Sequence, residues 1–147
     1  MKYSEAKQGR VFILRLEDGD IVHETIERFA AEKNIKAASL ICLGGADKGS
    51  VLITGPECSR SEKIETITNI LDDAHEILGV GTIFPDENEH PHLHMHIACG
   101  RDRKVTAGCI RRGVKTWYVI EVVITELVDT TARRLLDPVI GFSLLQP

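Results

Sequence analysis

The sequence predicts an α+β fold in which an antiparallel sheet of about seven strands packs against one main α-helix. Two observations lead to this prediction. Only residues 21–34 repeat their apolar side chains at helical spacing. The other apolar runs are short, rich in β-branched residues and separated by tight turns, which favours successive antiparallel strands. A chain of 147 residues is long enough for one domain, over residues 1–147, with a buried core.

The elements are predicted in order from residue 11. Residues 11–16, VFILRL, are typical of a strand, and Asp18-Gly19-Asp20 is typical of a turn. Asp20 is placed to cap a helix that begins at Ile21 and ends near Asn34. After a turn over residues 85–88, the run from His90 to Cys99 predicts a strand rich in histidine. The other predicted strands cover residues 37–43, 51–54, 63–70, 76–84, 105–110 and 115–127.

The last of these strands is apolar on both of its faces. One face would carry Tyr118, Ile120, Val122 and Ile124. The opposite face would carry Trp117, Val119, Val123 and Leu127. A sheet that is wet on one side alternates apolar with polar residues, so this pattern indicates that both faces are covered. A single helix cannot cover both faces of a wide sheet, and we therefore predict a homo-oligomer.

The histidine run is the most informative functional feature. Because alternate residues of a strand point to the same side, His92, His94 and His96 would form a ladder of imidazoles. Neighbouring imidazoles can bind a divalent metal, and zinc suits them well. His90 precedes a proline in the turn and is the weakest candidate. The alternatives are a solvated strand face, or imidazoles that form hydrogen bonds at a subunit interface.

Two further residues are candidates for a supporting role. Glu121 lies between Val119 and Val123 on a largely apolar face, where a carboxylate must be paired or bound to metal. It could accept a hydrogen bond from a histidine, ligate the metal or act as a general base. An interface salt bridge with an arginine is the alternative. His75 begins the strand before the histidine turn and could approach the ladder only from a neighbouring subunit.

Composition and charge exclude several classes of function. The net charge of −4 gives no overall attraction to DNA. Binding to DNA would need a local basic patch. The basic residues occupy two turns at opposite ends of one predicted strand. These are Arg101, Arg103 and Lys104 in one turn and Arg111, Arg112 and Lys115 in the other. We expect no membrane span, because no apolar run approaches about 20 residues.

The cysteine pattern and the polar start of the chain point to the cytoplasm. Residues 1–8 lack the apolar stretch of a signal peptide. Cys42, Cys58, Cys99 and Cys109 show no C-x-x-C spacing, so we expect reduced and mostly buried thiols. The glycine-rich segment 44–50 lacks phosphate-loop spacing, and a strand follows it. A cupin site would need a glutamate shortly after His96, where the chain reads Ile97-Ala98-Cys99-Gly100.

Several segments together resemble the PPC domain, the plants and prokaryotes conserved domain, in its stand-alone prokaryotic form. The resemblance rests on residues 75–81 (HEILGVG), 91–96 (PHLHMH), 105–110 (VTAGCI) and 121–124 (EVVI). Residues 15–37 and Gly44-Gly45 also fit. The resemblance implies a trimer of antiparallel sheets, each with a packed helix. In plants the domain accompanies AT-hook segments in DNA-binding proteins, whereas some prokaryotic members resemble metal binders. That metal-binding role transfers to His94 and His96, and then to His92.

The chain departs from the family pattern in two places. It contains no Arg-Gly-Arg-Pro AT-hook, which weakens a DNA-binding role. Where many members read Gly-Gly-His-Leu, it has Ala107-Gly108-Cys109-Ile110, so a histidine that would complete a site is absent.

The sequence therefore predicts a homotrimeric binding or assembly module, DNA-binding or regulatory, with a zinc site on the histidine strand. No residue is assigned to catalysis or to contact with nucleic acid. The alternative is a metal-dependent enzyme that acts on a small molecule, in which His94 and His96 hold the ion and Glu121 is the general base.

Overall fold

The computed structural model describes residues 1–60 and 64–147, and this part of the chain forms one helix and ten strands. The helix, α1, covers Val22–Glu32. The strands are β1 (Lys7–Glu17), β2 (Ala38–Ala46), β3 (Val51–Pro56), β4 (Thr66–Ile70), β5 (His75–Pro85), β6 (Pro91–Arg101), β7 (Lys104–Cys109), β8 (Thr116–Val128), β9 (Arg133–Leu136) and β10 (Ser143–Gln146).

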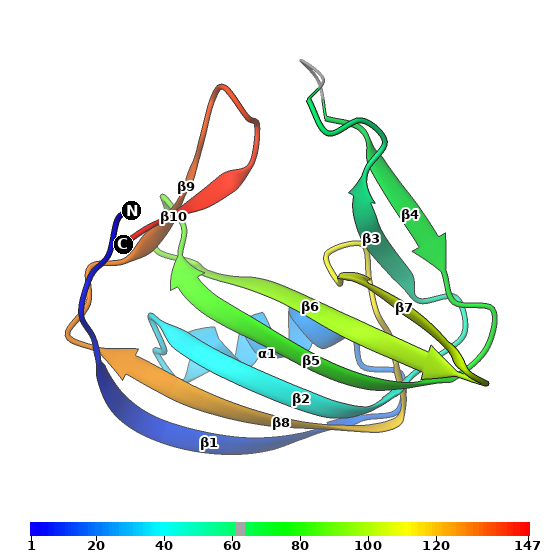
Figure 1. The fold of residues 1–147 in the computed structure, drawn as a ribbon. Helices are drawn as coiled ribbons and strands as arrows, with labels where there is room; N and C mark the ends of the chain where they lie inside the picture. Colours follow the sequence, from blue (N-terminus) through cyan, green and yellow to red (C-terminus); the bar gives the residue numbers. More distant parts are fainter. Residues whose placement is uncertain (61–63) are drawn as a thin grey trace.

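Eight of the strands form one antiparallel sheet in the order β1-β8-β2-β5-β6-β7-β3-β4. Strands β9 and β10 form a separate hairpin. Figure 1 shows α1 behind the sheet, while the β3–β4 and β9–β10 hairpins rise on the right and left above β5 and β6. The α+β class and the antiparallel sheet with one helix are thus confirmed, with eight strands in the main sheet instead of about seven.

The helix buries the apolar face that its sequence predicts. Val22, Ile26 and Ala30 are buried, and α1 packs against β6. Beneath the helix, the core takes the inward side chains of the central strands, among them Ile120, Ile124, Leu93 and Ile97. No helix in the described part of the chain is both long and apolar enough to cross a membrane.

The predicted cap of the helix is wrong. Ile21 occupies the N-cap position in an extended conformation, and no side chain caps the helix. The carboxylate of Asp20 accepts the backbone N–H of Glu17 at 2.9 Å, so it closes the turn between β1 and α1. The Val22 N–H donates to the carbonyl of Val114 at 2.9 Å. Tertiary contact with the loop before β8 therefore takes the place of a local cap.

A bulge in β8 also changes the predicted faces of that strand. Gly44 pairs with Ile120, but Gly45 pairs with Trp117, which leaves two residues of β8 extra. Tyr118 has a φ of 57° and is exposed. The alternation predicted that it shares a face with Ile120, and this prediction is wrong. Gly44 is required here, because a Cβ at this position would lie 2.3 Å from the carbonyl oxygen of Val119.

The sheet face opposite the helix is apolar and uncovered in the single chain. It presents Ile13 from β1, Val123 from β8, Ile41 from β2 and Val80 from β5, with exposed fractions of 84% for Ile13 and 62% for Val80. Ile13 pairs with Val123, Val123 with Ile41, and Ile41 with Val80, so the four side chains run across the sheet in one row. We call this row the open face. Val80 in turn pairs with His96, which brings the histidine strand to its border.

Candidate metal centre

Strand β6 separates two kinds of side chain, as the alternation predicted. Leu93, Met95 and Ile97 are buried on the helix side. His94 and His96 are exposed on the opposite side, with ring centroids 5.0 Å apart and ring planes at 84°. The two imidazoles therefore project from one extended ribbon and lie next to each other, as two ligands of one ion must.

Cys109 joins these two histidines from the neighbouring strand. It ends β7 and pairs directly with His96 across the β6–β7 ladder. The nearest ligand atoms of His94, His96 and Cys109 all lie within 4.8 Å of one another. Directly opposed residues of neighbouring strands have Cβ atoms about 5 Å apart, which explains the approach. The structure thus assembles two nitrogens and one sulfur around one point.

Sequence reasoning missed Cys109 as a possible ligand. The position was noted only as one where a family histidine is absent, although a thiolate binds the same metals as an imidazole. The signal was therefore in the sequence. All four cysteines are free thiols, as expected, but only Cys42 and Cys99 are buried. Burial raises the pKa of Cys42 to about 12 and that of Cys99 to about 11, so these two remain protonated core residues.

The residue before Cys109 has to be glycine. A Cβ on Gly108 would lie 2.4 Å from the carbonyl oxygen of Ile53, so any side chain here would push β3 away. Cys109 itself pairs with Ile53 on β3. The close approach of β3 closes one side of the cluster, and Gly108 permits it.

The other candidate residues lie at different distances from the cluster. His92 lines the same cavity as His94 but does not belong to the group of three ligand atoms. His90 stands in the turn before β6, with its ring 3.8 Å from the carboxylate of Asp86. Partial burial, followed by the charge of Arg111, lowers the pKa of His92.

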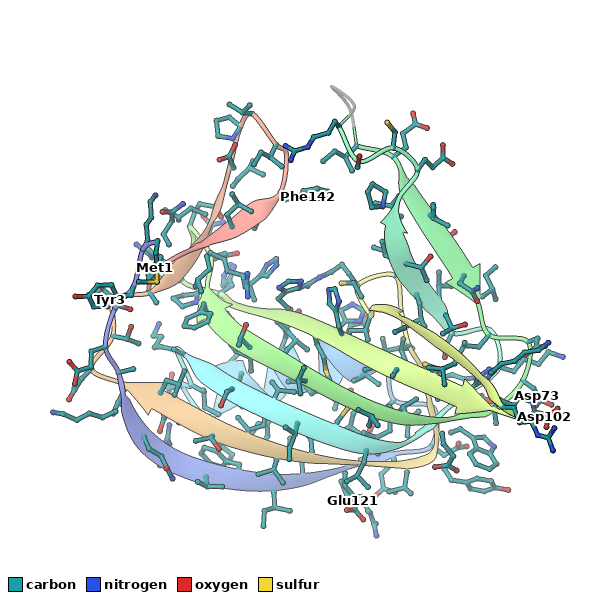
Figure 2. All side chains as sticks on the ribbon, viewed as in Figure 1. Met1, Tyr3, Asp73, Asp102, Glu121 and Phe142 are labelled. Carbon is teal, nitrogen blue, oxygen red and sulfur yellow. The ribbon has the colours of Figure 1, made fainter. Side chains whose placement is uncertain are left out.

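Neither supporting candidate reaches the cluster within one chain. Glu121 pairs with Leu43 on β2, and Leu43 pairs with Leu78 on β5, so two strands separate it from β6. Figure 2 shows Glu121 at the lower edge of the sheet, away from β6. His75 begins β5, whereas the partner of His94 is Thr82, seven residues further along that strand. A role for either residue would require a neighbouring subunit.

The surroundings of His94 keep its ring neutral. Partial burial, followed by the positive charge of Arg134, lowers the pKa of His94 to about 4. The ring is therefore neutral near pH 7, and a neutral imidazole offers the lone pair that a metal requires.

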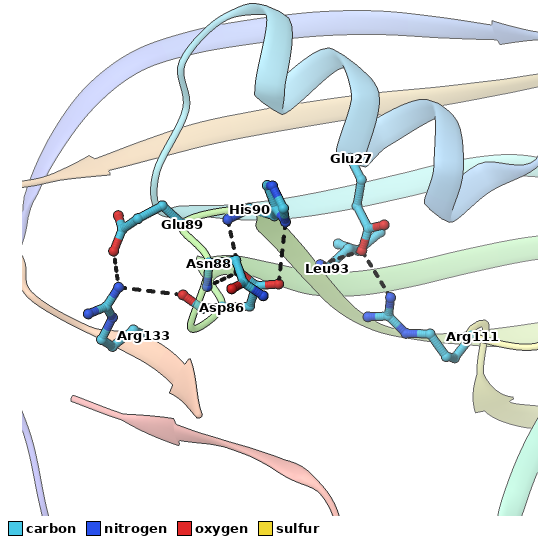
Figure 3. Close-up of polar contacts among 8 residues, drawn as sticks. All are labelled: Glu27, Asp86, Asn88, Glu89, His90, Leu93, Arg111 and Arg133. Carbon is cyan, nitrogen blue, oxygen red and sulfur yellow. Dashed lines mark hydrogen bonds and ion pairs between the residues drawn. The ribbon is translucent and has the colours of Figure 1, made fainter. Parts of the chain in front are cut away.

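Hydrogen bonds to two carboxylates hold the start of β6 in place, as Figure 3 shows. Glu27 of α1 accepts the backbone N–H of Leu93 at 2.8 Å and the guanidinium of Arg111 at 2.9 Å. In the turn before β6, Asp86 accepts the backbone N–H of His90 at 2.9 Å. These contacts fix the first residues of β6 to the helix and to the turn.

A cavity of about 930 Å³ opens beside the cluster. Its polar end contains the histidines, Cys109 and the guanidinium groups of Arg111 and Arg134. Its walls come from the β3–β4 and β9–β10 hairpins and from Leu78 and Val80 of β5. In Figure 2, Phe142 lies on the inner side of the β9–β10 hairpin, toward β3 and β4. Neither the β9–β10 hairpin nor the presence of Arg134 at this site was predicted from the sequence.

Comparison with solved structures finds the same fold in other proteins. A metal-containing protein from Archaeoglobus fulgidus is 26% identical, with 100% of both chains covered and a TM-score of 0.85. A plant- and prokaryote-conserved (PPC) protein from Pyrococcus horikoshii is 19% identical, with 100% of this chain and 98% of that chain covered and a TM-score of 0.85. A protein from Bacteroides thetaiotaomicron that carries a provisional DNA-binding designation is 19% identical, with 96% of both chains covered and a TM-score of 0.75.

No curated protein matches the chain. The model of one family does match, over residues 3–128, which is most of the sequence. This match confirms the resemblance found in the sequence. The chain belongs to the Plants and Prokaryotes Conserved (PCC) domain family.

Proposed function

We propose that this protein is a homotrimeric binding module that holds a divalent metal, with zinc as the expected ion, at His94, His96 and Cys109. One observation carries the proposal: two imidazole nitrogens and a thiol sulfur lie within 4.8 Å of one another at the end of a cavity. The metal-containing relative from Archaeoglobus fulgidus, at 26% identity over the whole chain, supports it.

The donor set fits zinc better than it fits hard cations. Zinc accepts nitrogen and sulfur ligands in tetrahedral geometry, whereas calcium and magnesium prefer oxygen. Three protein ligands leave the fourth position open toward the cavity, where an external molecule can reach it. A thiol ligand must stay reduced, which favours the cytoplasm as the location of the protein.

Elemental analysis of the purified protein tests the metal site. We expect close to one zinc per chain in the natural sequence and less than about a tenth of that in His94→Ala, His96→Ala and Cys109→Ser. Cys58→Ser is the matched control, because Cys58 lies outside the cluster. Metal-free protein that does not take up added zinc would contradict the proposal, as would zinc that stays bound in all three cluster variants.

The trimer is proposed from the open face. Ile13, Val123, Ile41 and Val80 form an apolar row that crosses four strands without cover in the single chain. Contiguous apolar surface of this kind is unusual on a monomer, and a second copy of the chain offers the same surface in return. The family resemblance sets the number of copies at three.

Light scattering after gel filtration tests the trimer. We expect three times the mass of one chain for the natural sequence. Ile41→Glu should shift the mass toward the monomer, because it places a charge in the middle of the open face. Ile70→Glu is the control, since Ile70 is even more exposed than Ile41 but lies on β4, away from this face. A monomer in the natural sequence would overturn the trimer proposal.

A metal-dependent enzyme is the second candidate. The open fourth position and the adjoining cavity favour it, because catalytic zinc sites keep such a position. The general base predicted from the sequence, Glu121, would have to come from another subunit. Hydrolysis of model esters or phosphoesters by the zinc-loaded protein, absent in His94→Ala, would favour the enzyme. Zinc binding without any turnover would favour the binding module.

A regulatory version of this binding module would contact DNA directly. Arg101 and Arg111 stand at opposite ends of β7, so one chain does not gather its basic turns into a patch. Contact with DNA would then need turns from several subunits. A mobility-shift titration at rising salt tests this, since phosphate contacts weaken steeply with salt. No shift at low salt would remove direct DNA recognition from the proposal.

A further inference from the structure

Arg134 is a buried cation that has no acidic partner among residues 1–60 and 64–147. It lies on β9 with only 5% of its surface exposed. One nitrogen of its guanidinium donates to the hydroxyl of Thr82 at 2.8 Å, and the group stands 5.8 Å from the ring centre of Phe84. Its Nε has no hydrogen-bond partner in the described structure. The charge is therefore shielded from water but not neutralised.

The strand pairing places this guanidinium beside the metal cluster. Thr82, which holds it, pairs across the β5–β6 ladder with His94. Phe84, over which it lies, pairs with His92. Arg134 and His94 line the same cavity.

The other partly or fully buried arginines in the described structure behave differently. Arg133 pairs with the carboxylate of Glu89. Arg111 donates to Glu27 at 2.9 Å. Burying a charge without a partner costs free energy, so such groups are normally paired. The free Nε of Arg134 thus indicates an anion that comes from outside the described residues.

The rest of the cavity is apolar. Its walls include Ile53 and Pro56 from β3 and Phe142 and Leu144 from the β9–β10 hairpin. Pockets lined in this way hold an apolar body, while a few polar groups fix its orientation. The charged end and the apolar walls together define an amphipathic ligand.

We propose that the cavity binds an apolar molecule with one oxyanion head, a carboxylate or a phosphate monoester, and that Arg134 binds this head. This proposal adds a ligand class to the proposed function. It rests on the proposed metal site only for a contact between the oxyanion head and the metal. The contact with Arg134 does not require the metal.

Titration calorimetry with four probes tests the ligand class. Decanoate and decyl phosphate both carry an apolar chain. Their heads differ, so the pair distinguishes a carboxylate from a phosphate monoester. Decanol lacks the charge, and acetate lacks the chain. We expect binding of decanoate, decyl phosphate or both, and at least about tenfold weaker binding of decanol and acetate. Binding of decanol as tight as that of both acids, or no binding of either acid, would overturn the proposal.

Arg134→Met tests the residue, with Arg133→Met as the matched control. Arg133 directly precedes Arg134 on β9 but pairs with Glu89, as Figure 3 shows. We expect Arg134→Met to weaken binding of the acid at least about tenfold and Arg133→Met to leave it unchanged. The melting temperature of ligand-free Arg134→Met should not fall, because the variant removes an unpaired buried charge. A lower melting temperature together with loss of the trimer would show that a subunit contact neutralises Arg134, and would overturn the proposal.

Phe142→Glu provides a test that does not touch the buried arginine. Phe142 is 43% exposed on the β9–β10 hairpin, so we expect this variant to fold. A negative charge in the apolar wall should repel the acid and weaken its binding. Undiminished binding in this variant would place the acid elsewhere and contradict the proposal.

Titrations with and without zinc separate the two proposals. If the protein binds no zinc but still binds acid in an Arg134-dependent way, the metal site fails and the anion site stands. If zinc binds and neither acid does, the anion site alone fails.

Discussion

The two faces of β6 differ in what holds them. On one side, Leu93, Met95 and Ile97 are buried against the helix and β5. On the other side, His94 and His96 meet no helix and face a cavity. The same eleven residues thus supply part of the core and most of the candidate site.

This difference separates stability from function along one strand. Buried apolar side chains stabilise the fold through the surface that they remove from water. Exposed imidazoles contribute little to folding, and their arrangement is informative because folding does not require it. The helix side holds the strand rigid, and the cavity side uses that rigidity to keep two rings 5.0 Å apart.

The largest effect is expected on the helix side. Ile97→Ala should lower the free energy of unfolding by about 2–5 kcal/mol, because a buried side chain is replaced by a cavity. Ile97 packs where a Cβ on Gly79 would lie only 2.5 Å away, so the backbone of β5 leaves little freedom to refill the space. Urea unfolding of metal-free protein measures the change. A loss below about 1 kcal/mol would mean that the two faces do not differ as described.

The next effect is expected from the metal on the cavity side. Free zinc at a hundredfold excess over its Kd should raise the free energy of unfolding by about 2.7 kcal/mol, because only the folded chain brings the ligands together. Thermal unfolding with zinc or with a chelator measures the shift. His94→Ala should show no such shift. An equal shift in this variant would place the zinc away from the cluster.

A smaller effect is expected from the carboxylate that connects α1 to β6. Glu27→Gln should cost about 1–2 kcal/mol of unfolding free energy, because it weakens the charge-assisted bonds to the Leu93 N–H and to Arg111. Glu24→Gln is the control on the same helix, since Glu24 is exposed and only reaches His23 at 4.0 Å. Equal effects in urea unfolding would show that Glu27 does not hold the strand.

The smallest effect is expected for the imidazoles when no metal is present. His96→Ala in metal-free protein should change the free energy of unfolding by no more than about 0.5 kcal/mol, because the ring is exposed. Urea unfolding of His96→Ala and of Ile97→Ala compares the loss of stability at two neighbouring residues on opposite faces of β6. A loss as large as that of Ile97→Ala would assign the ring to the core.

The sequence predicted most of the fold where the signal is local. The helix predicted over residues 21–34 and the alternation on β6 follow from spacing within one segment. Both are found, the helix with the shorter range Val22–Glu32. The predictions for Asp20 and Tyr118 were wrong because contacts from elsewhere overrode the local pattern. Val114 satisfies the first N–H of the helix, and a bulge beside Gly44 turns Tyr118 outward. Of the predicted strand over 63–70, residue 63 lies outside the described residues.

The candidate site divides in the same way. His94 and His96 were predicted as neighbours because two residues that alternate on one strand must share a side. Cys109 and Arg134 reach the site from segments that are distant in sequence. Pairing of β7 with β6 brings in Cys109, and the β9–β10 hairpin brings in Arg134. Such long-range pairings depend on the folding of the whole chain.

By itself, the sequence determined the class of the fold, the family and a ribbon with imidazoles on one side, since these follow from the period of the strand and from the order of the segments. Only the tertiary structure decided what stands opposite the ribbon. A thiol and a guanidinium come to the imidazoles there because the sheet register and the packing of the last hairpin set their positions. No local pattern encodes those distances.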